Sequence, residues 1–262
     1  MSGEKKDLNL EKIKFEMLKI FNNKYRVNYN DADFTGKLSI PRLGNYILDT
    51  AGLHAMELNI SMQALQNKNM TWVISGLHFD FYSFPEVNAF IFVKTKISDY
   101  SKITCKRDFF ITGSDNAKVA DVSSEWLIIN TLTRRPVFLD DAFPGVGDLV
   151  FEKENQVEKY KHLRFNFSEN AKRLKYRVMY SDIDINGHLY SMRYLEMSLN
   201  MLGEDFFKSG KIVSADLNFL SEVLYNQEVE LIMQAPSPDC RQIEMLREEK
   251  PVFRVEFRVL SA

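Results

Sequence analysis

The side chains best suited to chemistry are concentrated between Tyr176 and Gly203, where Asp184, Asn186 and His188 occupy alternate positions of one short run. Alternate side chains of an extended segment point to the same side, so these three are expected to converge on one small volume. Histidine titrates near neutrality and transfers protons, asparagine is an uncharged donor and acceptor, and aspartate can orient a ring or a water. Backbone N–H groups at the start of the helix expected next would stabilise a developing oxyanion. The same D-I-D-I-N-G run also suits a simple strand-to-helix turn, because Asp and Asn are favoured turn residues.

An earlier copy of this segment, from Tyr25 to Gly52, lacks the reactive pair. Where the later copy has Asn186 and His188, the earlier copy has Thr35 and Lys37. The repeat predicts a duplicated fold with one active site, and the asymmetry favours chemistry at the two positions that differ.

The aspartates of the segment are repeated in both copies, so their identity alone does not indicate catalysis. Asp182 is matched by Asp31, which predicts a structural role, and Asp184 is matched by Asp33. Asp184 therefore remains open between function and turn formation.

A further carboxylate, Glu222, follows the expected strand at 211–220 and precedes apolar Val223 and Leu224. Apolar neighbours would partly desolvate this carboxylate and make it a useful base. The alternative is an edge glutamate that faces solvent. Alignment of Leu77 and Phe79 with Leu217 and Phe219 puts Tyr82 at the corresponding place in the first copy.

Hydrophobic patterning predicts the same element order in both copies, one strand, one helix and four more strands. The first copy has expected strands at 21–30, 71–81, 88–97, 102–112 and 118–131 and a helix at 39–52; the second has strands at 174–180, 211–220, 228–234, 242–247 and 252–260 and a helix at 189–202. This order resembles the hotdog fold, in which a curved antiparallel sheet wraps a central helix. We therefore expect an α+β protein made of two tandem hotdog units.

The expected units cover 1–150 and 151–262, joined by a Pro- and Gly-containing linker at about 134–172. Residues 1–20 are expected to form a polar, partly helical lead-in. The first unit has about 11 extra residues between helix and second strand, in the segment 54–70, which could line or cover a ligand cavity.

Composition excludes several classes of protein. The formal charge of −2 gives no global basic field, which argues against nucleic-acid binding. The local clusters Arg134 with Arg135 and Lys172 with Arg173 are either solvated faces or a docking patch for an acidic partner. Two distant cysteines form neither a disulfide framework nor a metal knuckle. We expect a cytoplasmic bacterial protein without membrane contact, because the chain starts without a signal or transit peptide and has no apolar run of about 20 residues.

Three motifs carry a resemblance to a known family. S-D-I-D-I-N-G-H-L-Y-S-M-R-Y-L-E at 181–196, E-W-L-I-I-N-T-L-T-R-R-P at 125–136 and the weaker L-N-F-L-S-E at 217–222 closely resemble the acyl-acyl-carrier-protein thioesterases of plants and bacteria. The resemblance extends over about 21–259. It implies a tandem hotdog enzyme that hydrolyses acyl-acyl carrier protein, releases a free fatty acid and so ends chain elongation.

The resemblance also implies roles for single residues. Asp184, Asn186 and His188 would be the catalytic trio and Glu222 would activate the water. Plant members have a cysteine after that glutamate, whereas this chain has Val223, which excludes a covalent acyl-cysteine route at that position if the resemblance holds.

The remaining expectations concern the substrate and its partners. The acyl chain would lie in the first unit, against Leu53, Met56, Leu58, Met62 and Leu65, and the carrier protein would dock on Arg134, Arg135, Lys172 and Arg173. No metal or organic cofactor is called for, and monomer and homodimer are both reasonable. The alternatives are an acyl-coenzyme A thioesterase of the same fold and a non-catalytic module that binds or senses acyl-thioesters.

Overall fold

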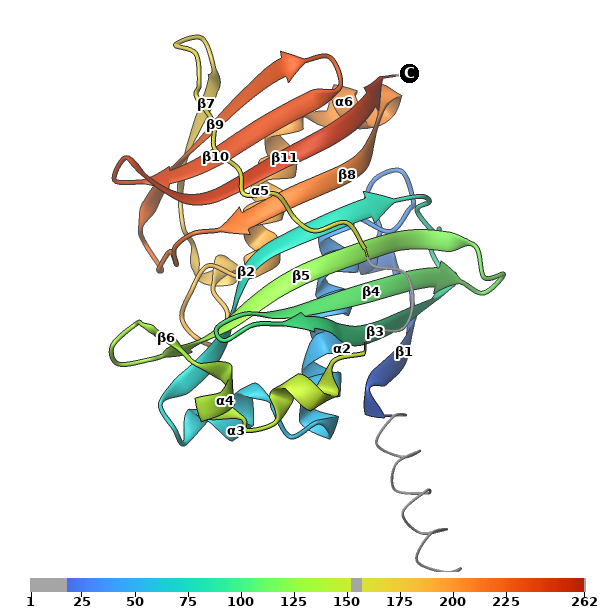
Figure 1. Ribbon diagram of the computed structural model, residues 1–262. Helices are drawn as coiled ribbons and strands as arrows, with labels where there is room; N and C mark the ends of the chain where they lie inside the picture. The colour runs from blue at the N-terminus through green and yellow to red at the C-terminus, as the bar shows by residue number, and fades with distance from the viewer. Residues whose placement is uncertain (1–17, 152–156, 262) are drawn as a thin grey trace, which may run out of the picture.

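A single antiparallel sheet organises the molecule. The computed structural model describes residues 18–151 and 157–261, and within them the sheet has 11 strands in the order β1-β3-β4-β5-β2-β8-β11-β10-β9-β7, with β6 paired to β5 (Figure 1). The first half contains β1 (Ile20–Arg26), α2 (Ile40–Glu57), α3 (Met62–Gln66), β2 (Met70–Phe81), β3 (Phe90–Tyr100), β4 (Cys105–Gly113), β5 (Lys118–Asn130), β6 (Pro136–Val137), α4 (Leu139–Ala142) and the 3₁₀ turns η1 (Tyr29–Asp31) and η2 (Val146–Leu149). The second half contains β7 (Lys172–Arg177), η3 (Tyr180–Asp182), α5 (Ser191–Leu202), α6 (Glu204–Ser209), β8 (Gly210–Phe219), β9 (Glu228–Ser237), β10 (Cys240–Arg247) and β11 (Lys250–Ser261).

The predicted element order is confirmed in both copies, which makes the protein an α+β tandem hotdog. The two halves join edge to edge where β2 pairs with β8, from Gly76 opposite Asn218 to Asp80 opposite Ser214. The short elements that were not predicted include α3, α4, η2 and α6. Each spans only four to six residues, which is too short for a hydrophobic period to be recognised.

Helices α2 and α5 lie on one face of the sheet and fill its curvature (Figure 1). Pro41 occupies the first turn of α2, where its missing N–H costs nothing. The two helices approach closely at Gly44, because a Cβ there would lie 2.1 Å from the Met192 sulfur. The buried residues of α2, which include Ile40, Leu43 and Ile47, recur every three or four positions and therefore lie mainly along one side of the helix, whereas an apolar helix surrounded by other structure was expected.

The connection between the halves differs from the expected linker. Residues 134–150 fold with the first half, because Leu139, Ala142 and Val146 are buried in an apolar cluster with Leu65 and Ile128. Pro and Gly suggested an open linker, but a sequence pattern does not show that short helical turns can bury three apolar residues.

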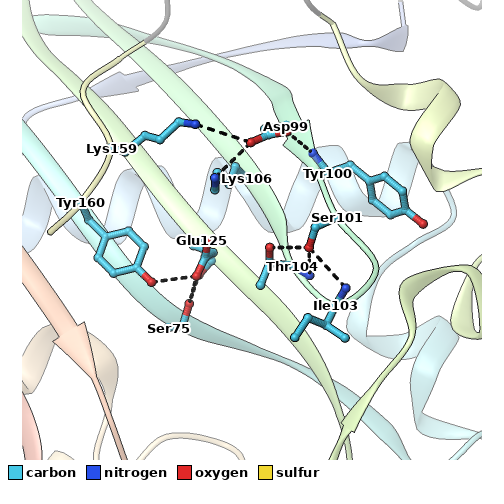
Figure 2. Close-up of polar contacts among 10 residues, drawn as sticks. All are labelled: Ser75, Asp99, Tyr100, Ser101, Ile103, Thr104, Lys106, Glu125, Lys159 and Tyr160. Atoms are coloured by element: carbon cyan, nitrogen blue, oxygen red, sulfur yellow. Dashed lines mark hydrogen bonds and ion pairs between the residues drawn. The ribbon is translucent and has the colours of Figure 1, made fainter. Parts of the chain in front are cut away.

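From 157 to 171 the chain crosses the sheet on the face opposite α2 and α5 (Figures 1 and 2). The Tyr160 hydroxyl donates a hydrogen bond to Glu125 Oε1 (2.7 Å), which also accepts one from Ser75 (3.1 Å) (Figure 2). The Tyr160 ring lies over Gly76, where a Cβ would come within 2.4 Å of it. Further along, the Leu163 N–H donates to Asn218 Oδ1 on β8 (2.7 Å). The crossing segment therefore fastens the joint between the halves.

The lead-in expected at 1–20 falls outside the described residues up to position 17. Within the described part of the chain, no helix is both long and apolar enough to cross a membrane.

Candidate functional site

The reactive loop is a turn built by Asp184. Its carboxylate oxygen Oδ1 accepts hydrogen bonds from the backbone N–H groups of Asn186 (2.8 Å) and His188 (3.1 Å). The Asp184 N–H donates to the His188 carbonyl (2.8 Å), and Gly187 takes the positive φ of 78° that the turn requires. The turn presents the Asn186 and His188 side chains outward, and Asp184 acts on the site through the backbone.

The first copy contains the same turn. Asp33 Oδ1 accepts hydrogen bonds from the Thr35 N–H (2.8 Å) and hydroxyl (2.6 Å), and the Asp33 N–H donates to the Lys37 carbonyl (2.9 Å). Gly36 has a φ of 76°. Asp31 and Asp182 also match, since Oδ2 of each accepts a 2.8 Å hydrogen bond from the backbone N–H three positions earlier, that of Asn28 and that of Met179. Both aspartate positions are therefore structural in both copies.

Glu222 lies beside the reactive loop because its neighbours pair with that loop. The Leu189 N–H donates to the Val223 carbonyl (2.7 Å), and His188 forms a β-bridge with Leu224. This pairing brings His188 Nε2 to 3.3 Å from Glu222 Oε2. The proposed acid–base pair, separated by 34 positions in the sequence, is thus in contact distance.

The environment of Glu222 is more polar than expected. Its side chain is 35% exposed, and Oε2 forms an ion pair with the Arg134 guanidinium and lies 3.3 Å from His188 Nε2. Val223 points the other way into the core and is fully buried. A flanking apolar residue did not desolvate Glu222, because neighbouring side chains in an extended segment face opposite sides.

The counterpart of Glu222 in the first copy is Phe84, and the alignment with Tyr82 was wrong. In the two halves, the N–H groups of Tyr82 and Leu220 make the equivalent hydrogen bonds, to Val119 and to Val252. The later bonds also match: the Pro85 carbonyl accepts from Leu38 as the Val223 carbonyl accepts from Leu189. The apolar alternation of these strands repeats every two residues, so a shift of two leaves the sequence pattern unchanged.

Residues of both halves line a cavity of about 400 Å³ at this site. Asn186, His188 and Glu222 line it from the second half. Its other lining residues come from the first half: Met62, Gln66, Asn69, Met70, Thr71, Trp72, Val73, Thr131 and Arg134. The reactive groups therefore line a cavity whose walls belong mainly to the copy without reactive residues.

The expected acyl-binding residues divide into three groups. Met62, in α3, lines the cavity. Leu65 is fully buried and Leu58 packs against the same apolar cluster. Leu53 and Met56 are exposed and do not line the described cavity. The extra segment at 54–70 contributes Met62, Gln66, Asn69 and Met70 to the wall. The start of β2 adds Thr71, Trp72 and Val73, which had no signal beyond their strand pattern.

The expected backbone donors for an oxyanion are already engaged. The N–H groups of residues 186–190 all donate within the loop region, to Asp184, Val223 and Asp182. The first residues of α5 are not among those that line the described cavity. Of the candidate donors, the Asn186 side-chain amide remains, since its contact with Asp184 Oδ2 is long at 3.4 Å.

The four basic residues expected to dock a carrier do not form one patch. Arg134 and Arg135 lie in the turn between β5 and β6, whereas Lys172 and Arg173 lie on β7, at the far edge of the other half (Figure 1). Lys172 donates to the Met201 carbonyl (2.8 Å), and Arg173 forms an ion pair with Glu230 (2.8 Å). Arg134 and Arg135 are both exposed; Arg134 lines the described cavity, and Arg135 is its neighbour in the turn.

Neither cysteine can supply a nucleophile at this site. Burial raises the pKa of the Cys105 thiol to about 11, and burial with nearby Glu256 and Asp239 raises the pKa of Cys240 to about 11. Both thiols are therefore protonated near neutral pH. Neither is among the residues that line the described cavity.

One group of described residues has the composition of a metal site, and it lies elsewhere. Ligand atoms of His78, Asp80 and Glu158 come within 4.8 Å of one another on the face crossed by the connecting segment. His78 Nδ1 is 2.9 Å from Asp216 Oδ1, and Nε2 is 3.3 Å from Asp80 Oδ2 without forming a hydrogen bond. Burial acts to lower the pKa of His78, but Asp216 and Asp80 outweigh it and raise that pKa. A protonated imidazole between two carboxylates accounts for this cluster.

Comparisons with known sequences give consistent matches along the chain. A family model described as the acyl-ACP thioesterase N-terminal domain matches residues 18–144, and one described as the C-terminal domain matches 166–258. Palmitoyl-acyl carrier protein thioesterases of chloroplasts are 20% identical in Gossypium hirsutum and 21% identical in Arabidopsis thaliana, each over 214 residues and 78% of this chain. These alignments cover 52% of each relative, so the chain spans about half the length of the curated relatives it matches.

Solved structures show the same fold. An acyl-ACP thioesterase from Bacteroides thetaiotaomicron superposes with a TM-score of 0.84 at 25% identity, covering 94% of this chain and 99% of that one. The 12:0-ACP thioesterase from Umbellularia californica also gives a TM-score of 0.84, at 16% identity, covering 93% and 98%. At 16% identity, the similarity to the Umbellularia californica structure shows a shared fold only.

Proposed function

Because the chain belongs to the acyl-acyl carrier protein thioesterase family, we propose that it hydrolyses the thioester between a fatty acyl group and acyl carrier protein. The products are a free fatty acid and the carrier's thiol. The observation that carries this proposal is the contact between His188 Nε2 and Glu222 Oε2 in the wall of a cavity that Asn186 also lines.

In the proposed mechanism a water molecule attacks the thioester carbonyl carbon directly. Glu222, with His188 beside it, takes a proton from this water as the carbon–oxygen bond forms. The Asn186 amide donates to the carbonyl oxygen and stabilises its negative charge. When the carbon–sulfur bond breaks, the proton passes to the leaving thiolate. Asp184 serves by holding the turn that places Asn186 and His188.

The acyl chain is proposed to extend from this point into the first half. Met62, Met70, Trp72 and Val73 provide apolar surface in the cavity, and burial of each methylene contributes about 0.8 kcal/mol. Arg135 remains the candidate for carrier docking beside the cavity. Leu53, Met56, Leu58 and Leu65 are not part of this proposal.

Steady-state hydrolysis of matched acyl-carrier and acyl-coenzyme A substrates tests the assignment. We expect turnover of acyl-acyl carrier protein with a higher kcat/KM than of the same acyl group on coenzyme A. A preference for coenzyme A would contradict the carrier assignment. Binding of both without release of fatty acid would identify a non-catalytic module instead.

A further inference from the structure

Among the described residues that line the cavity, Arg134 is the one charged side chain from the first half. Its Nη2 pairs with Glu222 Oε2, the same oxygen that lies 3.3 Å from His188 Nε2. All three residues line the cavity. One residue from each half therefore contacts the Glu222 carboxylate, and both contacts are made to the same oxygen, Oε2.

Hydrogen bonds within the turn between β5 and β6 fix the backbone conformation of Arg134. Arg134 has a φ of 59°, a left-handed conformation that costs a non-glycine residue on the order of 1 kcal/mol. Asn130 holds this conformation: its carbonyl accepts from the Arg134 N–H (2.9 Å), and its side chain accepts from Leu132 (3.0 Å) and Thr133 (2.9 Å). Pairing of β6 with β5 then fixes the far side of the turn.

The partners of Glu222 leave one oxygen for chemistry. Within the described residues, no hydrogen bond or ion pair involves Glu222 Oε1. Two other titratable neighbours bind backbone carbonyls rather than the Glu222 carboxylate. Arg247 of β10 donates to the Glu222 backbone carbonyl (2.5 Å), and Tyr194 of α5 donates to the Ser221 carbonyl (3.3 Å). Orientation of the side-chain carboxylate therefore depends on Arg134 and His188.

We propose that Arg134 is a positioning residue of the active site, which holds Glu222 by Oε2 against His188 so that Oε1 faces the attacking water. This inference rests on the proposed function and replaces carrier docking as the role of Arg134. A guanidinium suits the task, since it stays charged at every working pH and has a rigid planar fork. To bind a carrier carboxylate instead, Arg134 would have to release Glu222.

The test compares Arg134→Gln with Arg135→Gln, which removes the same charge from the adjacent position. Leu132→Ser, at a 75% exposed residue of the same turn, controls for turn integrity. Each variant is assayed on acyl-acyl carrier protein and on an acyl-N-acetylcysteamine thioester, which has no carrier to dock. Thermal unfolding checks that each variant is folded.

We expect R134Q to lower kcat about 10- to 100-fold on both substrates, because a misoriented base reacts slowly. Removal of the cation makes the carboxylate easier to protonate, so the acid limb of the kcat profile should move to higher pH. Arg134→Lys keeps the charge but loses the fork, and it should restore the pH profile and part of the rate. L132S should keep the parental rate.

Two results would overturn the proposal. In the first, R134Q and R135Q both raise KM for acyl-acyl carrier protein and leave kcat on the small thioester unchanged, which would make Arg134 a docking residue. In the second, a folded R134Q has parental kcat and an unshifted pH profile. If the parent itself hydrolyses neither substrate, the proposed function fails, which is a separate outcome.

Discussion

The turns at 33–37 and 184–188 share a scaffold and differ in the side chains they display. In each, an aspartate carboxylate accepts the N–H two positions later, a glycine has a φ near 77°, and the following leucine bonds to the opposite segment. Thr35, Lys37 and Phe84 in one half stand where Asn186, His188 and Glu222 stand in the other. The comparison shows that both turns depend on their aspartates, whereas the three positions that we propose for the chemistry differ between the halves.

The half without reactive residues still contributes to the site. It supplies most of the cavity wall, through α3 and the start of β2, and it supplies Arg134 from the β5–β6 turn. In the proposed function, the acid–base groups therefore belong to the second half and most of the substrate-binding wall belongs to the first.

The largest effect is expected at Glu222. Glu222→Gln keeps the shape but removes the base, so kcat should fall about 100- to 10,000-fold in steady-state hydrolysis of acyl-acyl carrier protein. The matched control is Phe84→Leu at the equivalent position of the first half, which should retain the parental kcat. Near-normal turnover by E222Q would remove Glu222 from the mechanism.

Replacement of Asp33 or Asp184 should have smaller effects: both replacements should lower stability, but only one should lower activity. Asp33→Ala and Asp184→Ala each remove hydrogen bonds that hold a turn, and each should lower the free energy of unfolding by about 1 kcal/mol. Only D184A should also reduce kcat, by about 10-fold, because the displaced turn carries His188. Chemical denaturation and turnover measured on both variants check this. Equal losses of kcat in D33A and D184A would contradict the division between the halves.

The smallest effect concerns the joint between the halves, where His78 of β2 contacts Asp216 of β8 (2.9 Å). The pKa of His78 is raised, so its contribution is complete below the unfolded value of about 6.5 and is lost as pH rises through the folded pKa. Burial acts to raise the pKa of Asp216, but the hydrogen bond and ion pair with His78 outweigh burial, and the pKa is lowered. The stabilising contribution of the Asp216 carboxylate is therefore lost only as pH falls below about 3.8.

Urea unfolding from pH 5 to pH 9, compared between the parent and His78→Gln, isolates this contribution. The parent should lose on the order of 1 kcal/mol relative to the variant as pH rises through that range. Asp80 of β2 and Lys161 and Glu158 of the crossing segment also lie near His78 or Asp216, and they are present in both proteins. An identical pH dependence of both proteins would show that the joint is not held by the charged imidazole.

The fold was largely predictable from sequence because its signals are local and occur twice. Alternating apolar residues located all ten major strands, and the two expected helices, at 39–52 and 189–202, correspond to α2 and α5. The strand register was not predictable: the apolar period of two cannot distinguish Tyr82 from Phe84 as the counterpart of Glu222. Residues 134–150 were also misjudged, because their burial depends on a cluster distant in sequence.

The site was predictable where the repeat provided an internal comparison. The differences at Asn186 and His188 could be read directly, whereas Arg134 could not be placed at Glu222 because no local pattern links positions in different halves. Exposure of Leu53 and Met56 was equally hidden, since α2 is apolar on more than one face and only packing shows which residues meet the cavity.

Converting the reactive turn to its own counterpart tests the account most directly. The double variant Asn186→Thr/His188→Lys keeps Asp184 and Gly187, so its thermal unfolding should stay close to that of the parent. Single-turnover hydrolysis of acyl-acyl carrier protein should fall by about 1,000-fold or more, while Thr35→Asn/Lys37→His in the first half leaves it unchanged. Hydrolysis within tenfold of the parental rate by the folded N186T/H188K protein would contradict the claim that these positions, and not the shared scaffold, carry the chemistry.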